Sequence, residues 1–270
     1  MSVVWFNGEL FEDSISIDPA DRGLMLGDGL FETIAVIGGN PIWANEHLAR
    51  MSQAAEELGL GFDEAQLRTA IGFVLKRSSA PGEVMRITLT RGVTPRGLAA
   101  PTQSPSLMVS LLPFDSAKQP QAITLATSKI RRNQWAPSSR HKTLSYIDNV
   151  AAAREVAGRA DDALMLNAEG YVACSTVGNV FLLRGAELIT PQDDQGVLCG
   201  ITRAKILKHA QEFGLRARQA IVTRDEIYSA DAVFLTNSLR LVTPVTKLDD
   251  RALGTKSVQH IKDYLKGLSP

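Results

Sequence analysis

The chain has 270 residues, of which 44% are hydrophobic and 21% charged, so it has the composition of a globular protein and the length of two modest domains. Its 29 basic residues balance 29 acidic ones, so no overall charge favours binding to nucleic acid or to an anionic membrane. The two cysteines, Cys174 and Cys199, lack metal-ligand spacing, so we expect no metal site, and reduced thiols are a simpler interpretation than a disulfide. Residues 1–8 lack a signal-peptide pattern and no apolar run reaches membrane-spanning length, so we expect a cytoplasmic protein.

The first half of the chain predicts two hairpins, two helices and a further pair of strands. Asn7-Gly8 is a typical hairpin turn, while Asn45 and Asp63 are suitable caps for the two helices, the first of which we expect to end before Gly59. The predicted elements are strands at 3–6, 9–11, 32–37, 41–43, 84–90 and 106–112, and helices that start at 45 and 63.

A polar, proline-containing stretch then divides the chain. We expect a small N-terminal α+β domain at 1–114, a linker at 115–121 and a larger C-terminal α+β domain at 122–270. After an irregular stretch at 128–140, the second half predicts a mixture of elements. These are strands at 123–127, 163–166, 171–173, 180–183, 187–189, 220–222 and 232–236, and helices at 143–158, 202–213, 224–228 and 258–265. Strands and helices alternate without a regular βαβ period, which favours two α+β domains over a doubly wound sheet.

Two turns rich in hydrogen-bond donors are candidate anion sites. Gly200-Ile201-Thr202-Arg203 opens a predicted helix, where Thr202 can act as the cap and the free amides and helix dipole attract an anion. Thr236-Asn237-Ser238 follows an apolar strand directly, and Arg50 lies on the first helix. An ordinary helix start and a surface arginine are the competing interpretations. Since the chain has no Walker A or Gly-x-Gly-x-x-Gly pattern, these donors indicate a compact phosphate on a small cofactor rather than a nucleotide.

Lys142 is the candidate amine nucleophile, because it begins a predicted helix and is followed by strands and turns with small polar residues. With its neighbours it belongs to a series of motifs that resembles the fold-type IV pyridoxal-phosphate enzymes of aminotransferase class IV. That family includes branched-chain aminotransferases, D-amino acid aminotransferases and 4-amino-4-deoxychorismate lyases. The motifs are Asp21-Arg22-Gly23, Gly27-Asp28-Gly29-Leu30-Phe31-Glu32-Thr33, Glu46-His47-Leu48 with Arg50, Thr90-Arg91-Gly92, Arg96-Gly97, Lys142 with Asn149-Val150, Gly170-Tyr171-Val172, Asn179-Val180-Phe181, Gly200-Ile201-Thr202-Arg203, Leu235-Thr236-Asn237-Ser238 and Pro244-Val245.

The resemblance implies a two-domain fold of the D-amino acid aminotransferase type, pyridoxal 5'-phosphate as cofactor and a homodimer that acts on a small amino-acid-like substrate. It implies that Lys142 forms the Schiff base and then moves the proton, because an amine in a desolvated site has a lowered pKa. Tyr146, one helical turn past Lys142, would reach the phenolic oxygen of the cofactor. The residues implied to hold the cofactor phosphate are Arg50, Ile201, Thr202, Thr236 and Asn237.

Cys174 departs from the family pattern. It stands where the family has a glutamate that pairs with the pyridine nitrogen and keeps it protonated. A thiol offers only a weak hydrogen bond, so we expect the ring to be a weaker electron sink and transamination to be less efficient. The alternative is that Cys174 only fills space and that the protein binds the cofactor with little activity.

The substrate motifs favour the lyase subgroup. Phe31, Thr33 and Arg96 are similar to its substrate-side residues, and Arg96 can bind one carboxylate by a bidentate contact. Leu98 stands where D-amino acid aminotransferases have a histidine, so their carboxylate site is incomplete here. We therefore expect a 4-amino-4-deoxychorismate lyase, with an aminotransferase acting on D-amino acids, branched-chain amino acids or amines as the alternative.

Overall fold

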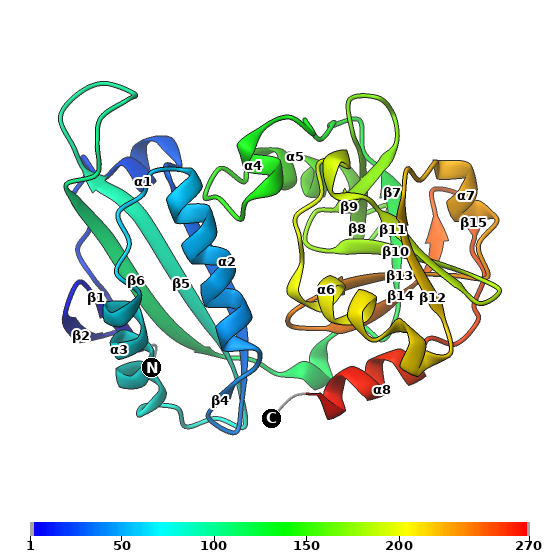
Figure 1. The fold of residues 1–270 in the computed structure, drawn as a ribbon, viewed down its shortest axis with the longest axis horizontal. Helices are drawn as coiled ribbons and strands as arrows, with labels where there is room; N and C mark the ends of the chain where they lie inside the picture. Colours follow the sequence, from blue (N-terminus) through cyan, green and yellow to red (C-terminus); the bar gives the residue numbers. More distant parts are fainter. Residues whose placement is uncertain (1–2, 269–270) are drawn as a thin grey trace. The chain divides into compact units, whose positions relative to one another are not determined.

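Two β-sheets organise the chain, one in each of two units (Figure 1). The computed structural model describes residues 3–268; the predicted domain ends at residues 1–2 and 269–270 lie outside them. The N-terminal unit comprises residues 3–117 and 141–146, and the C-terminal unit comprises residues 118–140 and 147–268. The chain thus changes unit inside the stretch expected as linker, and the short segment with Lys142 belongs to the N-terminal unit.

The N-terminal unit is built on an antiparallel sheet with the strand order β2-β1-β6-β5-β3-β4. Its strands are β1 (Val3–Phe6), β2 (Glu9–Glu12), β3 (Gly29–Ile37), β4 (Asn40–Pro41), β5 (Gly82–Val93) and β6 (Ser104–Pro113). The side chains of β5 alternate: Met85, Ile87 and Leu89 are buried, whereas Arg86 and Thr88 between them are half-buried. One face of the sheet therefore carries the hydrophobic core, and the other is available for polar chemistry.

Helices α2 (Ala44–Glu57) and α3 (Glu64–Leu75) supply the rest of this core, and α1 (Arg22–Leu26) precedes β3. Two of the predicted helix boundaries are confirmed, since Asp63 accepts hydrogen bonds from the first amides of α3 and Gly59 follows α2 in the left-handed conformation. The prediction that Asn45 caps α2 is wrong. The helix already begins at Ala44, and the chain enters it through Trp43 at φ 52°, without a side-chain cap.

The C-terminal unit contains a mixed sheet with the strand order β12-β11-β10-β13-β14-β7-β8-β9. Strand β9 also pairs with β10. A closed ring is therefore formed by β10, β13, β14, β7, β8 and β9, in that order. The strands are β7 (Ile123–Thr127), β8 (Asp162–Leu166), β9 (Val172–Ser175), β10 (Asn179–Arg184), β11 (Glu187–Pro191), β12 (Arg216–Ala220), β13 (Ala232–Asn237), β14 (Leu241–Leu248) and β15 (Arg251–Ala252). Strand β14 was not predicted, because Pro244 in its middle argues against a central strand.

Short helices surround this sheet (Figure 1). They are α4 (Pro137–Arg140), α5 (Ile147–Val156), α6 (Ile201–Lys208), α7 (Arg224–Tyr228) and α8 (Gln259–Gly267), with 3-10 turns at Ser116–Lys118, Asp193–Gln195 and Ala210–Phe213. Two predicted helices are corrected. The helix expected at 143–158 begins only at Ile147, and the one expected at 202–213 begins at Ile201, stops at Lys208 and continues as a 3-10 turn.

Further predictions differ in smaller ways. The stretch 128–140 is not wholly irregular, because it contains α4, and the strand expected at 220–222 lies at Arg216–Ala220. Strand β12 is polar and pairs in parallel with β11 at the edge of the sheet, so its sequence lacks the apolar pattern of a buried strand. Within residues 3–268, no helix combines the length and apolarity that crossing a membrane requires.

Candidate active site

The segment that carries Lys142 pairs with β3 through an isolated antiparallel bridge between Thr143 and Leu30. The Phe31 amide donates to the Lys142 carbonyl at 2.9 Å, and the Leu144 amide donates to the Gly29 carbonyl at 2.9 Å. An added Cβ on Gly29 would come within 2.4 Å of the Leu89 carbonyl oxygen, so this position needs a glycine. Lys142 therefore does not begin a helix, and the expectation that Tyr146 lies one helical turn beyond it is wrong; both residues precede α5.

The Lys142 side chain nevertheless lies beside Tyr146, because both meet the ring of Phe31. Lys142 Nζ is 4.2 Å from the Phe31 ring centroid and 5.6 Å from that of Tyr146. The two rings pack edge to face, with centroids 5.2 Å apart. On the same ring, Arg86 Cζ lies 3.6 Å from the Phe31 centroid. We call Phe31, Arg86, Lys142 and Tyr146 the Phe31 cluster.

Arg86 is the residue of this cluster that the sequence analysis missed. It lies on β5 opposite Thr33 of β3, so both are on the sheet face that does not carry the core. Burial lowers the pKa of its guanidinium, although the nearby Tyr146 and Glu32 act in the other direction. Among residues 3–268 its guanidinium forms no hydrogen bond or ion pair, so it is available to an anionic ligand. The sequence signal that could have identified Arg86 is that it is a single charged residue within the apolar run of β5.

Arg50 is oriented by a buried acid. Its Nε and Nη2 donate to the two carboxylate oxygens of Glu32 at 2.8 and 2.7 Å, and His47 Nδ1 lies 2.7 Å from Glu32 Oε2. Burial opposes the ionisation of Glu32, but Arg50 and the hydrogen bonds outweigh it and lower its pKa to about 2. Arg50 thus forms a bidentate ion pair with an ionised carboxylate, and its role at a cofactor phosphate stays a prediction.

In the C-terminal unit, Thr202 and Thr236 carry buried hydroxyls without a partner. Neither Oγ1 atom has a hydrogen bond within the described part of the chain. Thr202 is not the cap of α6, because Gly200 occupies that position and the first turn has no side-chain cap; Thr202 and Ile201 instead contribute first-turn amides. Asn237 closes its own turn, since its side-chain oxygen accepts from the amides of Leu239 and Arg240.

Strand register connects this region with Cys174. Asn179 on β10 is opposite Cys174 of β9 on one side and opposite Thr236 of β13 on the other, so the three residues share one face of the sheet. Cys174 and Thr236 are therefore two strand spacings apart, roughly 9–10 Å. An added Cβ on Gly200 would lie 2.1 Å from Asn179 Oδ1, so the start of α6 lies directly over Asn179.

These residues fit a phosphorylated cofactor. Two unpartnered buried hydroxyls and the first amides of a helix match the acceptors of a phosphate monoester. The separation of Cys174 from Thr236 suits a pyridine ring that carries a phosphomethyl group. That Lys142 of the N-terminal unit supplies the amine for such a cofactor stays a prediction; the cofactor, when bound, would supply an electron sink for carbanion chemistry.

Cys174 itself is a neutral thiol. Burial raises its pKa and the charge of Asp162 acts in the same direction, while Arg132 opposes them. Arg132 is buried and donates to the Gly196 carbonyl and to Asn149 Oδ1, so it is already engaged by other groups. The Cys174 side chain therefore offers a weak donor rather than a negative charge.

The remaining predicted site residues lie in the N-terminal unit. Phe31 is buried at the centre of its cluster, and Thr33 is half-buried next to it on the open sheet face. Arg96 is exposed on the loop between β5 and β6. No group of three histidine, cysteine, aspartate or glutamate side chains placed to hold a metal occurs between residues 3 and 268.

The two-unit fold, with its antiparallel and mixed sheets, is that of the fold-type IV pyridoxal-phosphate enzymes. The family model for amino-transferase class IV matches residues 29–248, so the chain belongs to this family, whose members use pyridoxal phosphate.

Three related proteins illustrate how widely activity varies in this family. D-alanine aminotransferase of Bacillus licheniformis is 29% identical, with 95% of this chain and 94% of that protein covered. Aminodeoxychorismate lyase of Bacillus subtilis is 26% identical, with 94% and 89% covered. The branched-chain aminotransferase of the archaeon Thermoproteus uzoniensis, solved with norvaline, superposes with a TM-score of 0.90 at 26% identity, over 98% of this chain and 93% of that one.

Because the buried hydroxyl of Thr202 has no partner, its removal should weaken cofactor binding without lowering the stability of the cofactor-free protein. Thr202→Val should weaken cofactor binding by about 1.5–3 kcal/mol, because a hydrogen bond to a charged phosphate is lost. The same change should not lower the melting temperature of the cofactor-free protein, since the removed hydroxyl has no partner there. Thr190→Val is the matched control: its buried hydroxyl donates to the Val180 carbonyl at 2.7 Å, so stability should fall while cofactor affinity is unchanged. Identical behaviour of the two variants would contradict the assignment.

Arg50→Ala should also weaken cofactor retention, by about 1.5–3 kcal/mol if Arg50 makes a charged hydrogen bond to the phosphate. The measurement is a spectroscopic titration of the cofactor-free protein with pyridoxal phosphate. Arg68→Ala on α3, which removes an exposed arginine paired with Glu64, is the control. Unchanged affinity in Arg50→Ala would remove this residue from the phosphate site.

Proposed function

We propose that this enzyme is a pyridoxal-phosphate lyase that converts 4-amino-4-deoxychorismate into 4-aminobenzoate and pyruvate. The observation that carries the proposal is the buried, neutral thiol of Cys174, where the family has a glutamate. A neutral group leaves the cofactor a weaker electron sink, which disfavours transamination. Elimination depends less on that sink here, because the electron pair leaves with the carbon–oxygen bond and the substrate ring becomes aromatic. We expect the enzyme to act in the cytoplasm.

The roles we propose follow from the residues already described. Lys142 carries the cofactor and removes the proton from the substrate carbon that bears the amino group. The substrate has two carboxylates, and the chain offers two arginines for them: Arg86 in the Phe31 cluster and Arg96 on its exposed loop. Thr33 is opposite Arg86 in the strand register, and we propose that its hydroxyl assists the same substrate. Thr202, Thr236, Ile201 and Arg50 are proposed phosphate ligands, with Tyr146 at the phenolic oxygen.

The test is a product analysis with the cofactor-loaded enzyme and 4-amino-4-deoxychorismate. The proposal expects pyruvate and 4-aminobenzoate in equal amounts, with no need for a keto-acid acceptor. Parallel incubations pair D-alanine, L-leucine or an amine with 2-oxoglutarate and measure the new keto acid. Keto-acid formation without pyruvate release from 4-amino-4-deoxychorismate would reject the lyase.

An aminotransferase is the second candidate. It is supported by the similarity to D-alanine aminotransferase, which spans nearly the whole length of both chains. The same parallel incubations distinguish the two reactions. Cofactor binding without turnover in any of them would favour the third interpretation, a weakly active binding protein.

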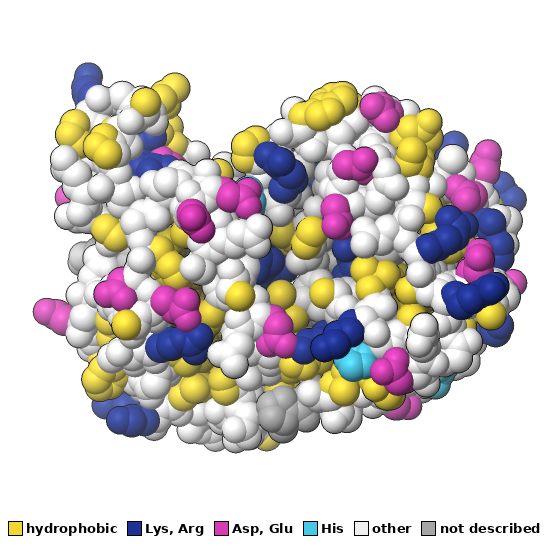
Figure 2. All heavy atoms as spheres, viewed as in Figure 1, with side chains coloured by type: hydrophobic (Ala, Val, Ile, Leu, Met, Phe, Trp, Pro, Cys, Tyr) yellow, Lys and Arg dark blue, Asp and Glu magenta, His cyan; other side chains and the backbone are white. Residues whose placement is uncertain are grey.

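We also propose a homodimer. Apolar side chains are exposed on the N-terminal unit at the end where Figure 1 shows α1, and Figure 2 shows such side chains there. They include Leu24, Met25, Leu26 and Leu98. An apolar surface of this kind is typical of a protein interface.

Light scattering should report twice the chain mass of 29.2 kDa. Met25→Glu should weaken the dimer, and a fully active monomer would contradict this prediction.

A further inference from the structure

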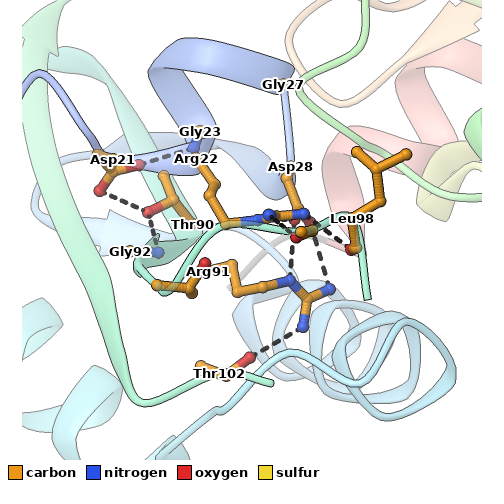
Figure 3. A network of polar contacts seen from close by, with 12 residues as sticks. Asp21, Arg22, Gly23, Gly27, Asp28, Thr90, Arg91, Gly92, Leu98 and Thr102 are labelled. Atoms are coloured by element: carbon orange, nitrogen blue, oxygen red, sulfur yellow. Dashed lines mark hydrogen bonds and ion pairs between the residues drawn. The ribbon is translucent and has the colours of Figure 1, made fainter. Parts of the chain in front are cut away.

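Arginine side chains hold the loop that follows β5, which we call the Arg96 loop (residues 94–103) (Figure 3). Arg22 is only 8% exposed, and its guanidinium donates to the Gly97 carbonyl at 2.8 Å and to the Leu98 carbonyl at 3.0 Å. Its Nε donates to Asp28 Oδ2 at 2.8 Å. One buried side chain thus fixes two consecutive peptide groups of an exposed loop.

The far end of the same loop is held by Arg91. Its Nε and Nη2 donate to Asp28 at 2.9 and 3.2 Å, and its Nη1 donates to Thr102 Oγ1 at 2.9 Å. Burial raises the pKa of Asp28, but the hydrogen bonds from Arg91 and Arg22 outweigh it, so the pKa is lowered and the carboxylate stays ionised. Asp28 is therefore the shared anchor of both arginines, as Figure 3 shows.

Asp28 also connects the loop with the lysine segment. It directly precedes β3, and the first residues of that strand, Gly29 and Phe31, form the backbone hydrogen bonds to Leu144 and Lys142. The network thereby ties the Arg96 loop to the strand that holds the Lys142 segment. All of these contacts lie within the N-terminal unit.

The loop presents one charge to its surroundings. Arg96 is exposed, and its guanidinium forms no hydrogen bond or ion pair with the residues that the structure describes. An exposed loop is ordinarily mobile, and withdrawing two arginines from water to restrain it costs desolvation energy. Such a restraint is useful when the position of the presented group matters.

We propose that Arg22 is a positioning residue, which fixes the Arg96 loop so that the Arg96 guanidinium meets a carboxylate of the substrate. This inference rests on the substrate role given to Arg96 in the proposed function. Arg22 acts through the loop backbone and does not touch the substrate. A mobile loop would present Arg96 correctly for only a fraction of the time, and the apparent affinity for substrate would fall by that fraction.

The test compares Arg22→Lys with Arg77→Lys, a matched change of an exposed arginine in the same unit. A lysine keeps the charge beside Asp28 but cannot bridge the carboxylate and two carbonyls. We expect Arg22→Lys to raise KM about five- to tenfold with kcat changed by less than about threefold, and to speed amide hydrogen exchange in the loop. The absorbance of bound cofactor should be unchanged, and Arg77→Lys should match the wild type in every measurement.

Two further variants, Arg96→Ala and the double variant Arg22→Lys/Arg96→Ala, show whether a failed test concerns Arg22, Arg96 or the reaction itself. If Arg22 acts through Arg96, Arg22→Lys should raise KM no further in an Arg96→Ala background. Additive effects, or an unchanged KM in Arg22→Lys while Arg96→Ala raises it, would overturn the inference. An unchanged KM in Arg96→Ala would remove Arg96 from the substrate site, and the inference with it. If the enzyme does not act on 4-amino-4-deoxychorismate, the lyase proposal fails in the product analysis. The KM values of the Arg22 and Arg96 variants are then measured with the carboxylate substrate that the enzyme does turn over, so the two failures are distinguished.

Gly97→Ala provides a second route if Arg22→Lys does not fold. Gly97 has φ +127°, which a residue with a side chain rarely adopts, yet an added Cβ would meet no atom within 4 Å. The change therefore strains the loop backbone at the peptide that Arg22 binds, while the Arg22 and Asp28 side chains stay as they are. It should raise KM in the same way and leave cofactor binding unchanged; a wild-type KM together with faster loop exchange would overturn the proposal.

Discussion

Lys142→Ala is expected to abolish turnover, by at least about 10⁴-fold, and to remove the visible absorbance band of the bound cofactor. The reason is that, in the proposed function, this one side chain is both the amine that binds the cofactor and the base that moves the proton. The Phe31 ring positions this amine at 4.2 Å, and backbone pairing with β3 fixes the segment that carries it. The measurement is a steady-state assay combined with an absorbance spectrum.

Two controls make this result specific. Lys142→Arg keeps a cation over Phe31 but cannot form the covalent link, so it should be as inactive as the alanine variant. Lys129→Ala removes an exposed lysine of the C-terminal unit and should keep full activity. Loss of the cofactor band in Lys129→Ala, together with its retention in Lys142→Ala, would show that the lysine has been assigned wrongly.

Cys174→Glu is expected to raise transamination relative to elimination by about tenfold, which corresponds to about 1.4 kcal/mol between the two transition states. A carboxylate at this position can hold a proton on the pyridine nitrogen and strengthen the electron sink. The buried thiol cannot, because its pKa is raised by burial and it stays neutral at working pH. Nearby Arg132 should help to keep the new glutamate ionised.

The control for this change is Cys174→Gln, which has the size of glutamate without its charge. The glutamine variant should keep the wild-type ratio of the two activities. A readout independent of activity is the nitrogen NMR shift of cofactor labelled at the pyridine nitrogen. That shift should indicate an unprotonated ring in the wild type and in Cys174→Gln, and a protonated ring in Cys174→Glu. Equal shifts in all three proteins would show that Cys174 does not face the nitrogen.

The sequence predicted the elements whose signals are local. The Asn7-Gly8 hairpin, the Asp63 cap and the position of Gly59 after α2 were all found as expected, because turn and capping chemistry depends on a few adjacent residues. The two-unit α+β architecture followed from the order of the elements.

The errors arose where distant contacts determine local structure. Thr143 and Leu144 were expected in a helix, but hydrogen bonds to β3, more than a hundred residues away, keep them extended. Arg86 was missed because its importance depends on meeting Phe31 of another strand, which no local pattern shows. Thr202 was expected as a cap, and only the packed structure reveals that its hydroxyl is buried without a partner.

The central claim is that Lys142 is the residue that binds the cofactor, and borohydride reduction tests it most directly. The reduced, cofactor-loaded enzyme is digested with trypsin, and the peptide that carries the pyridoxyl group is sequenced by mass spectrometry. Trypsin cleaves after Arg140 and Arg154 but not at a modified Lys142, so we predict a single modified peptide spanning residues 141–154. A pyridoxyl group found on another lysine, or no modified peptide from a protein that shows the cofactor band, would contradict the claim.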